Sequence, residues 1–414
     1  NEMSIAENHG GLYQNLKELR DTEGRSSCNF FRSLGLDYLY VGEGNDIPSL
    51  VAAFAKVKDT SRPTVVHIHT QKGKGYAPAE ADREEFHWEM PFDLETGKPK
   101  VDCSGMEDYH SLTGKFLLEK MKEDHTVVAI SSGTPTVIGF TPERRKQAGR
   151  QFVDVGIAEE HAVALASGIA AGGGRPVYGV YSTFIQRCYD QLSQDLCING
   201  NPAVITVFMG TVAGMNDVTH LGFFDIPLIS NIPNMVYLAP TCSEEYFAML
   251  EWAVRQTEYP VAIRVPGAAV VHRKEEFDTD YSELNRYKMT ARGETVAILA
   301  LGSFYDLGQA LKNKLREESG VEATLINPRY ITGLDEPMLE ELKVGHRIVV
   351  TLEDGVLDGG FGEKIARYYG NSEMRVLNYG LRKEFADRYN LDELMKANRL
   401  TDKQMAEDIA GILG

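Results

Sequence analysis

Short apolar runs rich in valine and isoleucine alternate along the chain with longer stretches of helical periodicity. Such runs, bounded by turn residues, predict buried strands, and their alternation with helices is typical of parallel sheets with crossover connections. The pattern therefore predicts an α/β protein. The predicted strands are 65–70, 126–132, 175–181, 202–210, 260–266, 295–303, 323–330, 347–354 and 374–380.

Two polar stretches, 80–105 and 270–294, divide the predicted strands into three groups, because charged residues, proline and glycine interrupt the periodicity there. We therefore expect three domains, at 1–102, 103–286 and 287–414. The first group holds one convincing strand, whereas the other two hold several. Since the chain also begins without methionine, we interpret the first domain as incomplete, left by proteolysis or an incomplete sequence rather than by a gene boundary.

The composition narrows the class of protein. Hydrophobic residues make up 43% of the chain, and the formal net charge is -17 with no basic stripe, which argues against binding to nucleic acid. No apolar run approaches the roughly 18 residues of a membrane span. The cysteines are odd in number and lack CxxC spacing, which favours a reducing cytoplasm over a disulfide framework or a zinc site. They are Cys28, Cys103, Cys188, Cys197 and Cys242.

The most informative stretch is DVGIAEEHAVALASGIAAGGGRPVYGVYSTFIQRCYDQ, residues 154–191. A strand is predicted to end at Ile157, so that Glu159 and Glu160 fall in the first turn of a helix. Acids at this position complement the helix dipole, and an aromatic residue such as Phe184 commonly packs in a core. Taken alone, the stretch favours these structural interpretations.

Together, IAEEHAV and YSTFIQRCYDQ resemble the thiamine diphosphate enzymes of the transketolase superfamily, and in particular the 1-deoxy-D-xylulose-5-phosphate synthases. The resemblance covers nearly the whole chain in collinear order. It implies a three-domain transketolase-like α/β fold: an incomplete diphosphate-binding domain, a pyrimidine-binding domain, and a C-terminal domain with a structural role in a homodimer. The other matching segments are NEMSIAENHGGL, TQKGKGYAPAE, THLGFFD and TLEDGVLDGGFGE.

The resemblance implies that the chain binds thiamine diphosphate and Mg²⁺. Glu159 matches the glutamate that contacts the pyrimidine ring nitrogen of the cofactor, and Phe184 matches the aromatic residue that stacks on this ring. The family's GDG segment, which precedes its metal-binding asparagine, is absent, so the chain begins inside the metal motif. The remaining implied cofactor contacts are Ile157 in the pocket, Lys72 near the diphosphate, and Asn1 and the Met3 carbonyl as magnesium ligands.

Two histidines match family residues that transfer protons at the reacting carbon. These are His87 and His220, and a neutral imidazole near pH 7 suits this role. Either histidine alone could be structural. Tyr181 and Arg187 also match active-site positions, and the charge of Arg187 requires a partner if it is buried.

The segments that bind the acceptor phosphate depart from the family pattern. The pattern DRAGxVGxDGxTHxGxFD becomes FMGTVAGMNDVTHLGFFD, with Met209 in place of an arginine and Asn216 in place of an aspartate. In RVPGA, which replaces RYPRG, Arg264 is kept and Gly267 replaces the second arginine. Because arginine forks hold phosphate oxygens in pairs, we expect a weakened or altered acceptor site.

The implied reaction is decarboxylation of pyruvate and transfer of the two-carbon unit to D-glyceraldehyde 3-phosphate. Its product, 1-deoxy-D-xylulose 5-phosphate, feeds isoprenoid and thiamine biosynthesis. The lost arginines leave open a transketolase-like carboligase with another, unphosphorylated acceptor. A non-catalytic paralogue is a further alternative, although the retention of Glu159, Lys72, His87 and His220 together counts against it.

Overall fold

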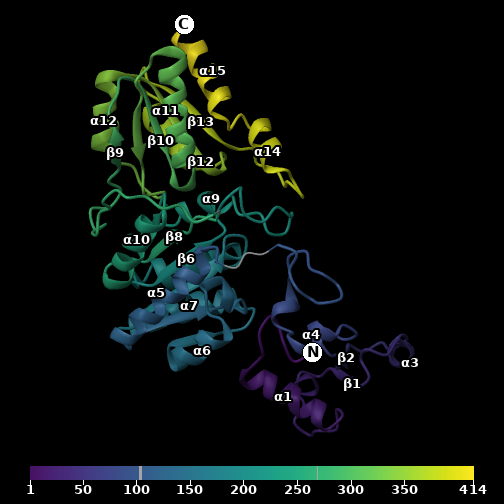
Figure 1. Cartoon of the computed structure of the whole chain (residues 1–414). Helices are drawn as coiled ribbons and strands as arrows, with labels where there is room; N and C mark the ends of the chain where they lie inside the picture. Colours follow the sequence, from purple (N-terminus) through teal and green to yellow (C-terminus); the bar gives the residue numbers. More distant parts are fainter. Residues whose placement is uncertain (102–104, 268) are drawn as a thin grey trace. The chain divides into compact units, whose positions relative to one another are not determined.

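The computed structural model describes residues 1–101, 105–267 and 269–414 and contains two compact units, Asn1–Met106 and Glu107–Gly414. Figure 1 shows the chain coloured from purple at the N-terminus to yellow at the C-terminus. No helix in the described ranges is long and apolar enough to cross a membrane. The four cysteines that lie within these ranges are free, whereas Cys103 lies outside them.

The N-terminal unit is built around a two-stranded parallel sheet. Strand β1 (Asp37–Val41) pairs with β2 (Thr64–Ile68), and α3 (Ile47–Val57) is the crossover between them. The Asp46 carboxylate caps α3 by accepting a hydrogen bond from the Ser49 amide at 2.8 Å. The expectation of a single convincing strand here was wrong: the sequence of β1, DYLYV, begins with a charged residue and contains two tyrosines, so it does not form a run rich in valine and isoleucine. The other helices are α1 (Gly10–Asp21), α2 (Phe30–Ser33) and α4 (Ala77–Ala81).

The second unit begins with a six-stranded parallel sheet in the order β4-β3-β5-β6-β8-β7. Continuous burial along β6 explains why four of its five residues are apolar, since strands of parallel sheets are covered on both faces. The four strands predicted in this region are confirmed. The strands are β3 (Val127–Ser131), β4 (Phe152–Asp154), β5 (Arg175–Tyr181), β6 (Val204–Phe208), β7 (Val236–Leu238) and β8 (Val261–Arg264). The helices are α5 (Tyr109–Glu123), α6 (Pro142–Ala148), α7 (Glu159–Ala171), α8 (Tyr189–Gln191), α9 (Asp225–Ser230) and α10 (Ser243–Arg255).

A five-stranded sheet in the order β13-β12-β10-β11-β9 completes the second unit. Its strands are parallel except for β9, which is an antiparallel edge strand. All four predicted strands are confirmed, whereas the short strands β7 and β9 were not predicted. The strands are β9 (Lys288–Ala291), β10 (Thr295–Ala300), β11 (Thr324–Asn327), β12 (His346–Val356) and β13 (Arg375–Leu381). The helices are α11 (Tyr305–Ser319), α12 (Glu336–Gly345), α13 (Phe361–Tyr369), α14 (Leu391–Ala397) and α15 (Asp402–Leu413).

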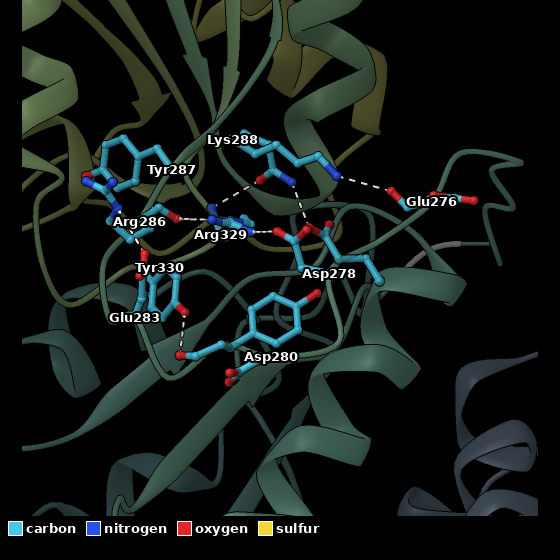
Figure 2. A network of polar contacts seen from close by, with 12 residues as sticks. Glu276, Asp278, Asp280, Glu283, Arg286, Tyr287, Lys288, Arg329 and Tyr330 are labelled. Carbon is cyan, nitrogen blue, oxygen red and sulfur yellow. Dashed lines mark hydrogen bonds and ion pairs between the residues drawn. The ribbon is translucent and has the colours of Figure 1, made fainter.

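The polar connector between the two sheets is held in place by Arg329, which follows β11. Its guanidinium donates to the Arg286 carbonyl at 2.9 Å through Nε and pairs with Asp278, and Figure 2 shows both contacts. The Arg329 carbonyl in turn accepts from the Ala239 amide at 2.8 Å, beside β7. The two sheets therefore belong to one compact unit, and the boundary at 286/287 stays a prediction.

Replacing Arg329 by alanine should lower the free energy of unfolding by about 1.5–3 kcal/mol, because it removes a buried charged donor from partly buried hydrogen bonds to Arg286 and Asp278. The matched control is Arg292→Ala, since Arg292 forms an exposed pair with Glu341, and surface pairs of this kind contribute less than about 1 kcal/mol. Urea denaturation followed by circular dichroism measures both. Equal losses in the two variants would contradict the role of Arg329 at the junction.

Candidate active site

The loop that leads to Glu159 begins at Asp154, the last residue of β4. Its Oδ1 accepts hydrogen bonds from the amides of Gly133 at 2.8 Å and Gly156 at 2.9 Å. Gly156 has φ of +74°, which glycine adopts readily. The prediction that the strand ends at Ile157 was wrong, because these contacts turn the chain three residues earlier. The Ile157 side chain is consequently 59% exposed.

Glu159 is the first residue of α7, and its burial is unusual for an acid in a first helical turn. It is 3% exposed. Its Oε2 lies 3.1 Å from Arg187 Nη1 as an ion pair, but accepts no hydrogen bond within the described residues. Glu160, the next residue, is exposed at 43% of its side chain and lies 3.7 Å from Arg187 Nε. A role in the helix dipole explains Glu160 but leaves the buried Oε2 of Glu159 without a hydrogen bond within the described residues.

Three aromatic side chains form a second part of this region. The ring of Phe184 lies 5.9 Å from that of Tyr181, at the end of β5, and 5.5 Å from that of His220, measured between centroids. Phe184 directly precedes the short turn Ile185–Cys188, which carries Arg187. The structure thus brings Tyr181, Phe184 and His220 together, and joins Arg187 to Glu159.

The topology explains why these residues meet. Glu159 follows β4 and Tyr181 ends β5, and these strands flank β3 on opposite sides. All three strands are parallel, so their carboxyl ends lie at one edge of the sheet where the strand order reverses. Ligands of open α/β sheets bind at such a switch point. Here the edge combines a buried carboxylate with an aromatic wall.

The N-terminal unit holds the other predicted cofactor contacts, but their polar atoms already have local partners. Lys72 Nζ donates to the carbonyls of Ser4 at 2.9 Å and Ile5 at 3.1 Å, and burial lowers the pKa of Lys72. Asn1 Oδ1 accepts from the Met3 amide at 3.1 Å. Lys72 therefore fixes the segment that carries the two predicted metal ligands.

A cavity of about 360 Å³ adjoins Asn1 in the same unit. It is lined by the basic side chains of Lys74 and Arg83, for which no role was predicted. The remaining predicted residue of this unit, His87, lies in the short turn Glu85–His87, where desolvation and the nearby Lys72 ammonium lower the pKa of His87. The ring is thus neutral at pH 7. Among the described residues, no group of three or more histidines, cysteines or acids could hold a metal ion.

Arg264 does not have the free guanidinium that a phosphate site needs. It is 4% exposed. Its Nε lies 2.7 Å from Asp225 Oδ2, and its Nη2 donates to the Asp354 carbonyl at 2.6 Å. The ion pair with Asp225 raises the pKa of Arg264 against the effect of burial. Arg264, the arginine kept from the family pattern, is therefore paired with a buried carboxylate.

The two positions that lack an arginine are neighbours in space. A Cβ atom added to Gly267 would lie 2.1 Å from Thr211 Cγ2 and 3.1 Å from Met209 Cα. Thr211 stands where the family pattern has glycine. Its methyl group occupies the space that an arginine at position 267 would need, so the changes at Thr211 and Gly267 are sterically coupled.

Sequence reasoning missed two residues of this region. Thr211 could have been found, since it departs from the quoted pattern directly beside Met209. Asp217 could also have been noticed as the acid next to Asn216, and its Oδ1 lies 3.0 Å from His220 Nδ1. Its contact with His220 required the structure.

Two protein-family models and several curated proteins match this chain. The family "Transketolase, pyrimidine binding domain" matches residues 107–270, and "Transketolase, C-terminal domain" matches residues 286–405. The 1-deoxy-D-xylulose-5-phosphate synthase of Clostridium tetani is 33% identical over 97% of this chain and 65% of its own length. That of Clostridium botulinum (strain Alaska E43 / Type E3) is 32% identical over 99% of this chain and 71% of its own length.

A solved structure described as "Split gene transketolase, inactive beta4 tetramer" shares the fold. The TM-score is 0.61 at 21% sequence identity, over 73% of this chain and 96% of that one. The curated relatives are longer than this chain, which spans between 59% and 71% of the length of those named 1-deoxy-D-xylulose-5-phosphate synthase.

Proposed function

The chain belongs to the 1-deoxy-D-xylulose-5-phosphate synthase family of transketolase-like proteins, and we propose that it decarboxylates pyruvate and transfers the two-carbon unit to an aldehyde with thiamine diphosphate. The buried Oε2 of Glu159, which forms an ion pair with Arg187 but accepts no hydrogen bond within the described residues, carries this proposal. An oxygen held in this way fits a protonated ring nitrogen of the pyrimidine. When bound, thiamine diphosphate supplies the carbon nucleophile for the reaction.

The residues of the chain have distinct tasks in this proposal. Glu159 accepts a hydrogen bond from the pyrimidine, and Arg187 pairs with the Glu159 carboxylate at 3.1 Å. Phe184 and Tyr181 provide the apolar wall for the ring, beside the exposed Ile157. His220, and His87 in the N-terminal unit, exchange protons with the substrates.

The diphosphate and Mg²⁺ are assigned to the N-terminal unit. Oxygen atoms of Asn1 and Met3 would supply two ligands, which suits a hard cation that takes its other ligands from phosphate and water. Lys72 supports this segment through its carbonyl contacts. We also propose a homodimer in the cytoplasm, which light scattering and cell fractionation would test.

The acceptor is D-glyceraldehyde 3-phosphate by analogy with the relatives, giving 1-deoxy-D-xylulose 5-phosphate for isoprenoid and thiamine biosynthesis. One observation favours an unphosphorylated aldehyde as a second candidate: Arg264 is paired with Asp225, and neither Met209 nor Gly267 offers a charge. Pyruvate consumption by the full-length protein, with thiamine diphosphate and Mg²⁺, tests both. Strong stimulation by the phosphorylated aldehyde supports the synthase, and equal stimulation by glyceraldehyde supports the second candidate. No turnover with any acceptor would contradict both.

Met209→Arg should improve the use of a phosphorylated acceptor. A hydrogen bond to a charged group contributes about 1.5–3 kcal/mol, or roughly ten- to a hundredfold in kcat/KM. Steady-state kinetics with glyceraldehyde 3-phosphate and glyceraldehyde measure the ratio of the two values. Met209→Gln controls for the loss of the thioether and should leave the ratio near that of the native protein. An unchanged ratio in Met209→Arg would show that this position does not face the phosphate.

A further inference from the structure

A carboxylate and a histidine form a pair in the loop between β6 and α9. Nδ1 of His220 lies 3.0 Å from Oδ1 of Asp217 and 2.8 Å from Oγ1 of Thr219. The Thr219 hydroxyl donates to the same carboxylate oxygen at 2.5 Å, and the Thr219 amide does so at 3.1 Å. The hydrogen bonds from Thr219 and His220 lower the pKa of Asp217 to about 2. The carboxylate is therefore ionised at neutral pH.

This pairing determines which nitrogen of His220 carries the proton. An ionised carboxylate can only accept hydrogen bonds, so Nδ1 must donate to Asp217, and Nε2 of the neutral ring is left unprotonated. Nε2 has no hydrogen-bond partner within the described residues. The ring also packs edge to face against Phe184, with an interplanar angle of 68°. The His220 ring thus belongs to the same aromatic cluster as Tyr181 and Phe184.

Asn216, which stands at the family's aspartate position, makes a different contact. The side-chain amide of Asn216 donates to the Tyr389 carbonyl at 3.1 Å, in the segment between β13 and α14. Asp387 from that segment accepts from the Val218 amide at 3.1 Å, and the Tyr389 hydroxyl donates to the Val212 carbonyl at 2.7 Å. The segment between β13 and α14 therefore holds this loop in place. The acid that contacts His220 is Asp217, one residue after the family's aspartate position.

We propose that Asp217 is a positioning residue that fixes the tautomer and orientation of His220, so that Nε2 accepts a proton during the reaction. The orientation follows from the contacts within the loop. The consequence for catalysis rests on the proposed function. If Asp217 only accepted hydrogen bonds from Thr219 within the turn, the fold would be the same, but neither tautomer of His220 would be required.

Nitrogen NMR of the full-length protein tests the tautomer without any cofactor. The protein is labelled with ¹⁵N-histidine, and His220→Gln assigns the signal among the ten histidines. In the native protein we expect a protonated Nδ1 and an unprotonated Nε2 in the neutral ring. Asp217→Asn should shift the population toward a protonated Nε2, whereas Asp190→Asn, which removes an exposed carboxylate, should not. An unchanged signal in Asp217→Asn would overturn the proposal.

Kinetics then test the catalytic consequence. Asp217→Asn should lower kcat at least about tenfold, as is typical when a histidine loses its orienting acid, with KM for pyruvate changed less than about twofold. Asp217→Glu should recover part of kcat. A changed tautomer with unaltered kcat would refute the catalytic part of the proposal. Lack of all turnover in the native protein would refute the proposed function, while the NMR result would still decide the tautomer.

Discussion

Glu159→Gln should reduce thiamine diphosphate-dependent turnover of pyruvate by at least about 100-fold, within the range of general acid–base catalysis. Glutamine keeps the shape of the side chain and an oxygen that can accept a hydrogen bond. It removes the negative charge that stabilises a protonated ring nitrogen and that pairs with Arg187 at 3.1 Å. Chemistry should therefore fail while folding and much of the cofactor binding remain.

The measurement for this variant combines two readouts. Hydrogen–deuterium exchange at C2 of the added cofactor, followed by proton NMR, reports activation directly, and calorimetry reports binding. Glu160→Gln is the matched control, since it makes the same change one residue later in the same helical turn. If both acids acted only through the helix dipole, the two variants would show similar effects of about 0.3–1 kcal/mol. Similar results would thus refute the assignment of Glu159.

Asp225→Asn should lower the free energy of unfolding by about 3–5 kcal/mol, because it leaves the buried guanidinium of Arg264 without its counter-charge. Asp225 is 1% exposed, and it also accepts a hydrogen bond from the Tyr237 hydroxyl. One substitution therefore disturbs two buried partners. The expected loss is the largest of those considered for stability.

Chemical denaturation of Asp225→Asn and the native protein measures this loss. Glu251→Gln is the control, since Glu251 pairs with Lys120 at 2.8 Å in a partly exposed position and should change stability by less than about 1 kcal/mol. The double variant Asp225→Leu/Arg264→Met should be more stable than Asp225→Asn, since it removes both charges. A loss below about 1 kcal/mol in Asp225→Asn would mean that Arg264 finds other compensation and could still serve a ligand.

Elements with a strong local signal could be predicted from the sequence. Strand β10, for example, contains an apolar run from Val296 to Ala300, and the helix that begins at Glu159 was expected there. Ile157 was assigned to a strand because the apolar pattern continues to it. The hydrogen bonds of the Asp154 carboxylate to two backbone amides, one of them from the distant Gly133, end the strand earlier.

The candidate site was predictable only in its residue types. Glu159, Phe184 and His220 could be named from the motifs, but the burial of the Glu159 carboxylate depends on packing between segments. The partner of Arg264 is Asp225, 39 residues away in the sequence, so no local pattern could indicate that this arginine is unavailable. Asp217 is, by contrast, close to His220 in the sequence, but only the geometry of the loop shows that this acid contacts the ring.

The junction around Arg264 limits how this protein can be recombined with its relatives. Arg264 ends β8 of the first sheet and donates to the carbonyl of Asp354, which lies on β12 of the second. In the opposite direction, the Asp354 side chain accepts a hydrogen bond from the amide of Val212, in the first half of the unit, at 2.7 Å. A chimera that joins the first half of one relative to the second half of another cuts through this reciprocal contact. A chimera of this kind should therefore function only when Val212, Arg264 and Asp354 are all taken from the same parent.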